Sequence, residues 1–413
     1  MNDQDPMFYA IHQMEVNGET NHVGTLAILA APSGRIEVMQ FRYEEEYLNQ
    51  PYARPLSPVN IELSPDPITF HSDGKSFVGV IDDLLPDDWG KKIIAKRLNK
   101  KYITDLDALE FIGGGVSIGA TKITALHETP NWNNGMPIAD TENILTAIFS
   151  NDISNLTLEE LEAAALVKGG SQTGGARPKM LVLNSEGKPC LIKPDQKHDE
   201  YSFAALEWAA LEVCRMAGLP TAVAAIYTLN NSISSLMIER FDISEEGGRY
   251  HLITINTLMK DPDSQMDALL YSYEDIADCI RKYSYQPTQD VKQLFGQLLI
   301  NQALLNSDDH LRNFSMIRDK IGWKLSPVYD VVTQQTFRAE HACEFNGSGF
   351  LPHLSEYKVT GKKLQLRGPD IEEVYQRVST ALKCWKSLLE SQSIHDETLL
   401  NIPSISNPDF YGF

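Results

Sequence analysis

The sequence has few cysteines and no long apolar run. Its five cysteines are scattered along 413 residues, and no two of them form a Cys-x-x-Cys pair. This usage is typical of reduced, buried thiols and provides no ligand set for a zinc site. No apolar run approaches the length of a transmembrane helix. The acidic residues 1–5 are not followed by an apolar segment, so we expect no signal peptide, no membrane contact and a cytoplasmic location.

Basic residues are also scarce. The chain has 36 Lys and Arg against 56 Asp and Glu, which gives a formal net charge of −20. A chain that grips nucleic acid on its own needs clustered Lys and Arg to neutralise phosphates, so this balance argues against that class of function. It is compatible with a basic protein partner. The hydrophobic content of 42% is that of an ordinary soluble globular protein, and the length predicts two or three domains.

The first third of the chain has the pattern of a β-rich region. Gly and Pro turn signals separate three strand-like runs, at residues 8–11, 23–29 and 36–41. Alternation of apolar and polar residues in the third run predicts a half-exposed sheet. A helical, basic segment follows over residues 82–102, and residues 129–135 have the composition of a linker. We therefore assign residues 1–138 to an N-terminal β-rich accessory subdomain.

The remainder has the element order of a kinase. A capping box at residues 157–160 begins a helix, and a glycine-rich loop follows at residues 169–179. Next come two strand-like runs, a helix and two further strand-like runs, at residues 180–183, 190–193, 200–217, 222–229 and 235–241. From about residue 255 the chain is mostly helical. This order predicts an α+β, two-lobed protein-kinase-like fold, with an N-lobe over residues 139–245 and a helical C-lobe over residues 246–413.

The most informative residues are Asp308, Asn313 and Asp330. A helix-like apolar segment at residues 294–305 runs into this polar cluster, and a strand-like hairpin at residues 314–325 leads to Asp330. A kinase-like phosphotransferase needs an Asp that orients the acceptor hydroxyl and takes its proton. It also needs an Asn and a second Asp that hold metal ions on the nucleotide phosphates. The spacing therefore predicts Asp308 as the base and the other two residues as metal ligands.

Two other interpretations of this cluster explain less. Asp309 and His310 would suit a metal-dependent hydrolase, but the other His and Cys residues supply no spaced ligand set. Capping of a helix end by Asp308 and Asp309 would leave the positions of Asn313 and Asp330 unexplained. For His310 we expect a hydrogen-bonding role in the site rather than proton transfer.

The glycine-rich loop has two interpretations. A glycine cluster is often only a flexible linker, but one directly before a strand lets backbone N–H groups wrap phosphates without side-chain clash. A Walker loop is excluded because Met180, and not Ser or Thr, follows Lys179. We favour the phosphate-binding interpretation, with contacts from Gly174, Gly175, Ala176, Arg177 and Lys179.

Lys193 and Glu207 form a predicted pair. Lys193 ends a strand-like run, where a lysine is often only solvated, and Glu207 lies on an otherwise apolar face of the helix at residues 200–217. A lone carboxylate on an apolar face needs a partner. Lys193 is the candidate, which would give the Lys–Glu pair of an assembled kinase site. The alternative, in which Glu207 reaches solvent at an edge, stays open.

Glu239, Arg240 and Phe241 end the last strand-like run. A chain that crosses between kinase lobes at such a point can read an adenine edge with its backbone groups, while Phe241 packs on the ring. Taken alone, the segment is an ordinary strand exit.

The motifs together resemble the HipA family of serine/threonine kinase toxins over most of the chain. The residues that carry the resemblance lie at 174–179, 191–194, 238–242, 308–313 and 325–330, and residues 84–88 and 117–119 resemble the family's N-terminal subdomain. The resemblance implies ATP and Mg²⁺ as cofactors, a catalytic group of Asp308, His310 and Asn313, and magnesium on Asn313 and Asp330. It also implies nucleotide contacts from Lys193, Glu207, Glu239, Arg240, Phe241, His310 and Tyr329.

The resemblance implies partners as well. The family's toxins phosphorylate a protein in translation, often an aminoacyl-tRNA synthetase, and a basic helix-turn-helix antitoxin that binds operator DNA neutralises them. We expect contact with operator DNA only through the antitoxin. Members can silence themselves by phosphorylating a serine in the glycine loop. Here Gln172 stands at the matching position, so Ser171 or Thr173 is the candidate for autophosphorylation.

The predicted function is that of an ATP- and magnesium-dependent protein serine/threonine kinase, acting as the toxin of a type II toxin–antitoxin pair. Two alternatives stay open: a kinase-like phosphotransferase that acts on a small molecule, and a non-catalytic binding or co-repressor protein with the same fold. The intact set of Lys193, Asp308, Asn313 and Asp330 argues against the second alternative.

Overall fold

Most of the chain is described by a computed structural model. The described residues are 5–31, 33–71, 79–86, 88–112, 118–150, 156–157, 160, 177–229, 233–260, 271–333 and 340–407. Several glycine-loop predictions lie outside these residues, namely those for Ser171, Thr173, Gly174, Gly175 and Ala176. The predicted capping box is present: the Thr157 N–H donates to the Glu160 carboxylate at 2.7 Å, and the Glu160 N–H donates to the Thr157 hydroxyl at 3.3 Å.

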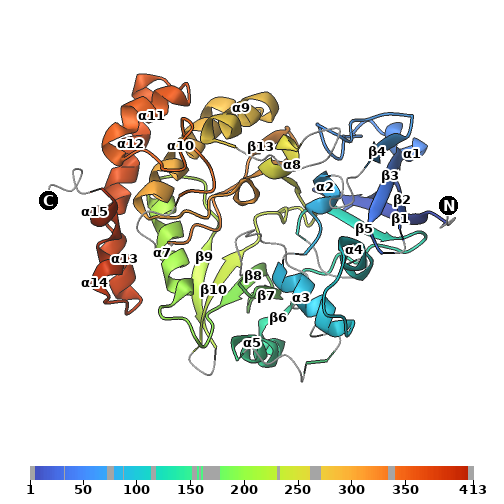
Figure 1. The fold of residues 1–413 in the computed structure, drawn as a ribbon, viewed down its shortest axis with the longest axis horizontal. Helices are drawn as coiled ribbons and strands as arrows, with labels where there is room; N and C mark the ends of the chain where they lie inside the picture. Colours follow the sequence, from blue (N-terminus) through green and yellow to red (C-terminus); the bar gives the residue numbers. More distant parts are fainter. Residues whose placement is uncertain are drawn as a thin grey trace.

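The N-terminal region forms a five-stranded antiparallel sheet (Figure 1). Its strand order is β4 (Ile68–His71), β3 (Ile36–Tyr43), β2 (Thr20–Ala30), β1 (Met7–Met14) and β5 (Thr121–Ala125). The three predicted runs lie within β1, β2 and β3, and burial alternates along β3 as predicted. β4 and β5 lie outside the predicted runs. β5 places Ile123 opposite Ile11, a pairing between distant segments that local periodicity does not specify.

A second, central sheet carries the predicted lysine strand. Its order is β6 (Met136–Pro137), β7 (Met180–Leu183), β8 (Pro189–Pro194), β10 (Ser234–Glu239) and β9 (Ala224–Thr228). One face packs on α7 (Phe203–Met216), and the other packs on α3 (Asp88–Arg97) and α5 (Glu142–Phe149). α7 begins later than predicted because Ser202 is its N-cap, whose side chain accepts from the Ala205 N–H.

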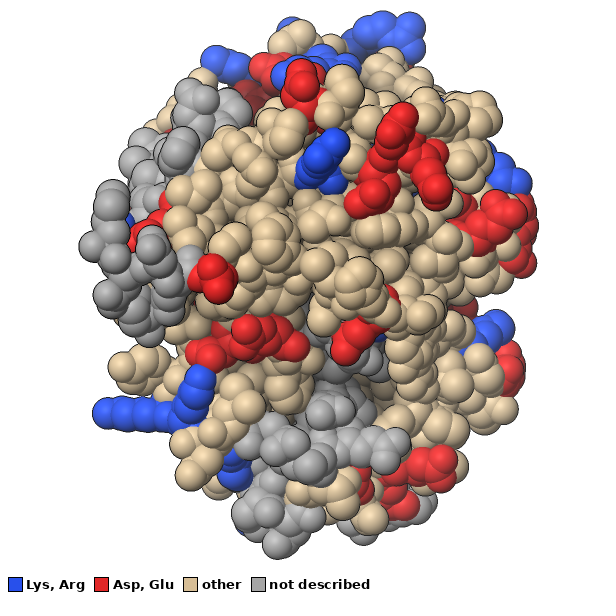
Figure 2. Space-filling view, turned by 90° about the vertical axis from the view of Figure 1, so that its right-hand side faces the viewer, with Lys and Arg blue, Asp and Glu red and all other residues tan. Residues whose placement is uncertain are grey.

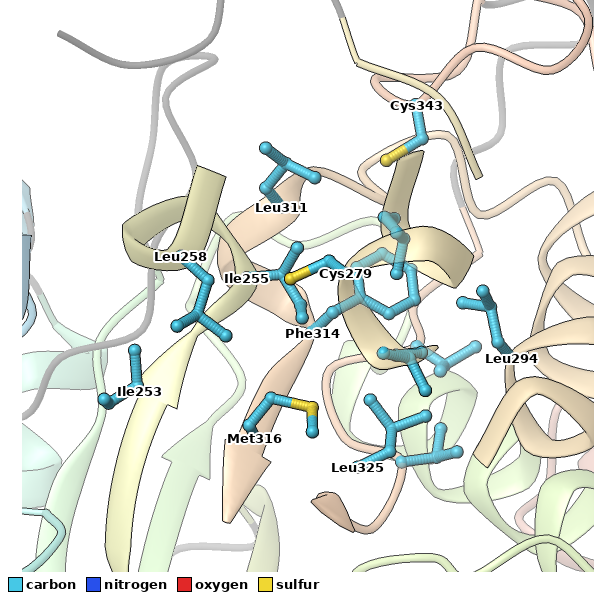
Figure 3. Close-up of a cluster of buried hydrophobic side chains, with 14 of the residues drawn as sticks. Ile253, Ile255, Leu258, Cys279, Leu294, Leu311, Phe314, Met316, Leu325 and Cys343 are labelled. Atoms are coloured by element: carbon cyan, nitrogen blue, oxygen red, sulfur yellow. The ribbon is translucent and has the colours of Figure 1, made fainter. Parts of the chain in front are cut away.

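A third, three-stranded sheet contains the predicted hairpin. It consists of β11 (His251–Thr254), β12 (Ser315–Arg318) and β13 (Trp323–Leu325). α8 (Ile255–Met259) contacts β11, while α9 (Tyr273–Tyr283) and α10 (Pro287–Ala303) contact β13, and η2 (Leu311–Asn313) precedes β12. Figure 3 shows buried side chains gathered in one apolar cluster that includes Leu311 and Phe314, which precede and follow the site residue Asn313 in the sequence. The polar turn therefore rests on a packed core.

The C-terminal helices lie at the end of the molecule opposite the N-terminal sheet (Figure 1). They are η3 (Leu354–Glu356), α11 (Tyr357–Lys363), α12 (Gly368–Leu382), α13 (Trp385–Ser391), α14 (Glu397–Leu400) and α15 (Ile402–Ser406). α12 packs on α10 and α7. The N-terminal region contributes α1 (Glu45–Leu48), α2 (Gly79–Asp82) and α4 (Asp105–Ile112), and η1 (Ile138–Asp140) precedes α5. No helix within the described residues is long and apolar enough to cross a membrane.

A buried histidine joins the N-terminal sheet to the third sheet. His251 is 2% exposed, with Nε2 2.9 Å from the Leu56 carbonyl and Nδ1 3.1 Å from the Thr121 hydroxyl. Burial, with help from the positive charge of Arg318, lowers the pKa of His251 to about 3. The folded protein therefore holds this ring neutral across the range in which an unfolded chain would protonate it.

We expect this histidine to make folding sensitive to acid. Because its folded pKa lies below its unfolded value of about 6.5, its contribution to stability is present above that pH and is lost as the pH falls. Between about pH 7 and pH 5 the free energy of unfolding should fall by about 2 kcal/mol more in the wild type than in His251→Gln. Urea unfolding at both pH values measures this difference, and an equal fall in the two proteins would contradict it.

Candidate active site

Lys193 lies at the centre of the site. Its Nζ is 2.7 Å from Glu207 Oε1 and 2.6 Å from Asp330 Oδ1. Only 12% of the Lys193 side chain and 5% of the Glu207 side chain are exposed. Burial alone would lower the pKa of Lys193, but the carboxylates of Asp330 and Glu207 outweigh it and raise the pKa, so the lysine stays charged. The predicted Lys–Glu pair is therefore present, and Glu207 does not reach solvent.

Strand alternation and helix packing bring these three groups together. In β8, Cys190 and Ile192 face the core shared with α3, so Lys193 faces α7. Glu207 lies on the side of α7 that packs against this sheet. Asp330 follows β13 with a φ of 56°, a left-handed conformation that Asp tolerates better than most residues.

The predicted base and its neighbours form one turn. The Asn313 side-chain Nδ2 donates to the Asp308 carbonyl at 2.7 Å, which closes the loop around η2. His310 Nε2 lies 3.7 Å from Asp308 Oδ1. This distance places the buried imidazole against the carboxylate without a short hydrogen bond, a contact suited to orienting Asp308.

The two aspartates of the site have opposite pKa shifts. Burial, only partly offset by His310, raises the pKa of Asp308 to about 6. Burial also pushes the pKa of Asp330 upward, but Lys193 and Lys179 outweigh it and hold the value at about 2. Asp308 can therefore exchange a proton near neutral pH, while Asp330 stays an anion that can hold a cation. Two carboxyl groups driven apart in this way are typical of an acid–base site.

Asp309 is a site residue that the sequence analysis missed in this role. Its carboxylate is fully buried and accepts from the Tyr273 hydroxyl at 2.6 Å, from His341 Nδ1 at 3.1 Å and from the Cys343 N–H at 3.2 Å. Asn301 Nδ2 donates in turn to the Tyr273 hydroxyl at 2.9 Å. This network ties the turn at residues 308–313 to α9, α10 and the segment after residue 340, and it is not a helix cap. The signal in the sequence that could have indicated this role is the pair of consecutive aspartates, Asp308 and Asp309.

A pocket of about 160 Å³ opens beside these residues. Its apolar wall consists of Leu84, Ile118, Leu191, Ile238, Phe241 and Leu252. Its charged and polar end includes Lys179, Lys193, Asn313, Ser315 and Asp330. A pocket lined by apolar side chains together with lysines and a carboxylate has the composition expected of a site for a base and its phosphates.

The predicted adenine segment lines this pocket. The Phe241 ring lies 5.7 Å from the Tyr329 ring, and Glu239 and Arg240 are also part of the lining. The N–H groups of Glu239 and Arg240 donate to the carbonyls of Val223 and Pro189, at 2.8 and 3.0 Å. These two N–H groups are therefore unavailable to an adenine edge, which narrows the prediction to the other backbone groups and the Phe241 ring.

Two arginines predicted to contact nucleotide serve the fold. The Arg240 guanidinium is buried in a two-bond pair with Asp242, at 2.9 and 2.6 Å. Arg177 pairs with Asp199 and stacks over the Phe203 ring at 4.1 Å, and it is not among the residues that line the pocket. Its interaction anchors the end of the glycine-rich loop to the start of α7, so a direct nucleotide contact is not supported for this side chain.

Tyr329 has a double role in the pocket. Its ring forms part of the lining, as predicted, while its hydroxyl lies 2.7 Å from the Ser315 hydroxyl and donates to the Arg312 carbonyl at 3.0 Å. The tyrosine thereby joins the segment before Asp330 to the turn that precedes Asn313.

The donor set fits a magnesium ion. Asn313 Oδ1 is buried and accepts no hydrogen bond from any residue that the structure describes. Together with the ionised Asp330 it offers two hard oxygen ligands, and Mg²⁺ often takes one or two ligands from a protein and the rest from phosphates and water.

Within the described ranges no group of three or more His, Cys, Asp and Glu could hold a metal, so the metal-hydrolase alternative gains no support.

Comparison with known proteins decides the family. The family model of the HipA-like C-terminal domain matches residues 171–385, just over half of the chain, and that of the HipA N-terminal domain matches residues 14–124. The chain belongs to the HipA family. The resemblance inferred from the motifs is confirmed.

This HipA-family protein is also similar to two curated proteins and to one solved structure. A Sinorhizobium fredii protein named "Putative kinase Y4mE" is 24% identical over 312 residues, 71% of each chain. A Haemophilus influenzae protein named "Putative kinase" is 27% identical over 184 residues, 40% of this chain and 53% of that one. The HipA of Shewanella oneidensis, solved with HipB and operator DNA, is 16% identical with a TM-score of 0.66 and covers 97% of this chain and 95% of its own. This likeness confirms the predicted α+β, protein-kinase-like fold.

Removal of the Asp309 charge should destabilise this HipA-family protein. In Asp309→Asn the new amide must face three buried donors, so we expect the free energy of unfolding to fall by about 1–3 kcal/mol. Tyr273→Phe removes only one of these donors and should cost less. Urea unfolding of both variants measures the effect, and an Asp309→Asn protein within about 0.5 kcal/mol of the wild type would refute the role.

Proposed function

We propose that this protein is an ATP- and Mg²⁺-dependent protein serine/threonine kinase and the toxin of a type II toxin–antitoxin pair. The observation that carries the proposal is the buried contact of Lys193 with Glu207 and Asp330, next to the turn that holds Asp308 and Asn313. Burial of a lysine between two carboxylates is costly, and the Lys–Glu pair of an assembled kinase site accounts for this arrangement. We also propose that the chain divides into an N-terminal accessory subdomain at residues 1–138, a kinase N-lobe at residues 139–245 and a helical C-lobe at residues 246–413.

In the proposed reaction Asp308 acts as the base. An acceptor hydroxyl placed beside its carboxylate would lose its proton to a carboxylate oxygen as the hydroxyl oxygen attacks the γ-phosphorus of ATP. The bond between that phosphorus and the oxygen bridging to the β-phosphate breaks at the same time, and ADP leaves with that oxygen. The raised pKa of about 6 makes Asp308 a better proton acceptor than an ordinary Asp, while it is still ionised at neutral pH. About a quarter of its side chain is exposed, at 26%, so the proton can afterwards pass to solvent.

The remaining site residues would bind the magnesium ion and the nucleotide and orient them. Asn313 and Asp330 would be the protein ligands of magnesium, which when bound neutralises phosphate charge during transfer. Lys193 and Lys179 supply positive charge at the phosphate end of the pocket, and Phe241 and Tyr329 supply rings at the apolar end. Ser171 and Thr173 stay predicted sites of autophosphorylation.

Asp308→Asn should abolish phosphoryl transfer while leaving ATP binding nearly unchanged. It removes the proton acceptor and no core packing, and base catalysis contributes about 10²–10⁴-fold. Radiolabelled ATP with this protein and a cell lysate measures the transfer, and calorimetry measures binding. Asp278→Asn, a change at an exposed Asp on α9, is the matched control and should behave as the wild type. Transfer by Asp308→Asn within about twofold of wild type would refute the assignment.

Asp330→Asn should weaken the magnesium dependence of ATP binding. Asn tolerates the left-handed φ of this position, so the substitution removes the charge without adding strain. We expect at least about a tenfold loss of affinity for ATP in the presence of Mg²⁺, and a smaller loss in its absence. Calorimetry under both conditions tests the metal role. If the wild type binds ATP equally well with and without Mg²⁺, that role is wrong.

The toxin assignment rests on the family and on charge. The Shewanella oneidensis HipA was solved with HipB and operator DNA, which supports an equivalent antitoxin partner for this chain. We propose that this chain meets operator DNA only through that partner, because its net charge of −20 disfavours direct contact with phosphates. Figure 2 shows Asp and Glu side chains spread over the face on the side of the N-terminal sheet, which suits a basic partner.

The lysate labelling described above also separates the two substrate classes. A labelled protein supports the protein-kinase proposal, and label found only in small molecules supports the alternative of a small-molecule phosphotransferase.

A further inference from the structure

Two consecutive acidic residues at the end of α2 reach from the N-terminal subdomain into the active site. Asp82 Oδ2 lies 3.1 Å from both terminal nitrogens of Arg312 and 3.1 Å from Lys260 Nζ. The side chains of Asp82 and Arg312 are each 15% exposed, and that of Lys260 is 1% exposed. An ion pair so shielded from water is stronger than a surface pair and restricts both partners.

Arg312 belongs to the catalytic turn. It is the middle residue of η2 and lies between the predicted base Asp308 and the predicted ligand Asn313. Its carbonyl accepts from the Tyr329 hydroxyl, and its neighbour Leu311 packs into the core. The turn therefore has three supports. Leu311 packs into the core, Tyr329 contacts the main chain at Arg312, and Asp82 of α2 pairs with the Arg312 side chain.

Hydrogen bonds to Thr254 and Thr257 fix the position of α2 against α8. Asp83 accepts from the Thr254 N–H at 2.9 Å and from the Thr254 hydroxyl at 2.8 Å. The Thr257 hydroxyl donates to the Gly79 carbonyl at 3.0 Å, and a Cβ at Gly79 would lie 2.7 Å from Thr257 Cγ2. The first turn of α8 therefore fixes both ends of α2, so Asp82 is presented to Arg312 on a rigid support.

We propose that Asp82 is a positioning residue of the kinase site. Acting through Arg312, it holds the η2 turn so that Asp308 and Asn313 keep their places beside the pocket. The N-terminal subdomain thereby completes the active site, to which Asp83, Leu84 and Ile118 also contribute lining. The inference rests on the proposed function for its kinetic consequence, but the restraint on the turn is independent of that function.

A double-mutant cycle tests the kinetic consequence. Asp82→Asn and Arg312→Gln should each lower kcat by about tenfold to a hundredfold, because small displacements of catalytic groups have effects of this size. The KM for ATP should change by less than about twofold, since neither change removes a predicted phosphate ligand. The double variant should be no slower than the slower single variant, as expected for two residues that act through one contact.

Two matched controls separate positioning from general stability. Lys260→Met removes a second cation that pairs with Asp82 and leaves the contact with Arg312, so its kcat should stay within about twofold of wild type. Lys91→Met breaks a pair with Asp105 in the same subdomain, away from the pocket, and should be unchanged. Multiplied losses in the double variant, or a loss in Lys260→Met as large as that in Asp82→Asn, would overturn the proposal.

Hydrogen exchange provides a readout that does not depend on activity. The amides of residues 308–314 should exchange faster in Asp82→Asn than in the wild type, while those of β1 and β2 should not. If the wild type transfers no phosphate, the proposed kinase function fails, and the exchange result still decides whether Asp82 restrains the turn. Unchanged exchange together with wild-type kcat in Asp82→Asn would refute the positioning role.

Discussion

The contact of Lys193 with Glu207 and Asp330 is the interaction on which the site depends. It joins a strand of the central sheet, the helix behind that sheet and the segment after the catalytic hairpin. Burying three charged groups is costly, and two carboxylates against one lysine leave an excess of negative charge. Lys179 reduces that excess, and a bound cation would reduce it further. The excess of negative charge that makes the site costly to build favours a bound cation, which agrees with the proposed role of magnesium.

The turn that holds the proposed base is supported from three directions. Leu311 and Phe314 anchor it to the apolar core, Asp309 ties it to α9 and to the segment after residue 340, and α2 holds it through Arg312. Groups that must meet a reacting atom need such support, because catalysis depends on geometry held by rigid elements. The N-terminal subdomain is thus part of the architecture of the site and not only an appendage to it.

Elements with a strong local pattern were predictable, and those that depend on distant partners were not. β7 has the predicted bounds, β12 and β13 lie within the hairpin predicted at residues 314–325, and α7 begins three residues late. Apolar periodicity and turn signals mark these elements. β5 and β11 escaped prediction, since each is a short strand specified by its partner in another segment. Arg177 was predicted to contact phosphates and Arg240 to lie in the adenine segment, but Asp199 and Asp242 pair with their guanidinium groups.

The sequence by itself determined the family, the kind of fold and the residues available for chemistry, because the spacing of Asp308, Asn313 and Asp330 and the helix face of Glu207 are local properties of the chain. Only the tertiary structure decided which of these groups meet. It paired Lys193 with both carboxylates, gave Asp308 and Asp330 opposite pKa shifts and brought Asp82 to Arg312. The physical reason is that burial and charge pairing depend on neighbours across the fold, and no local pattern encodes the distance between them.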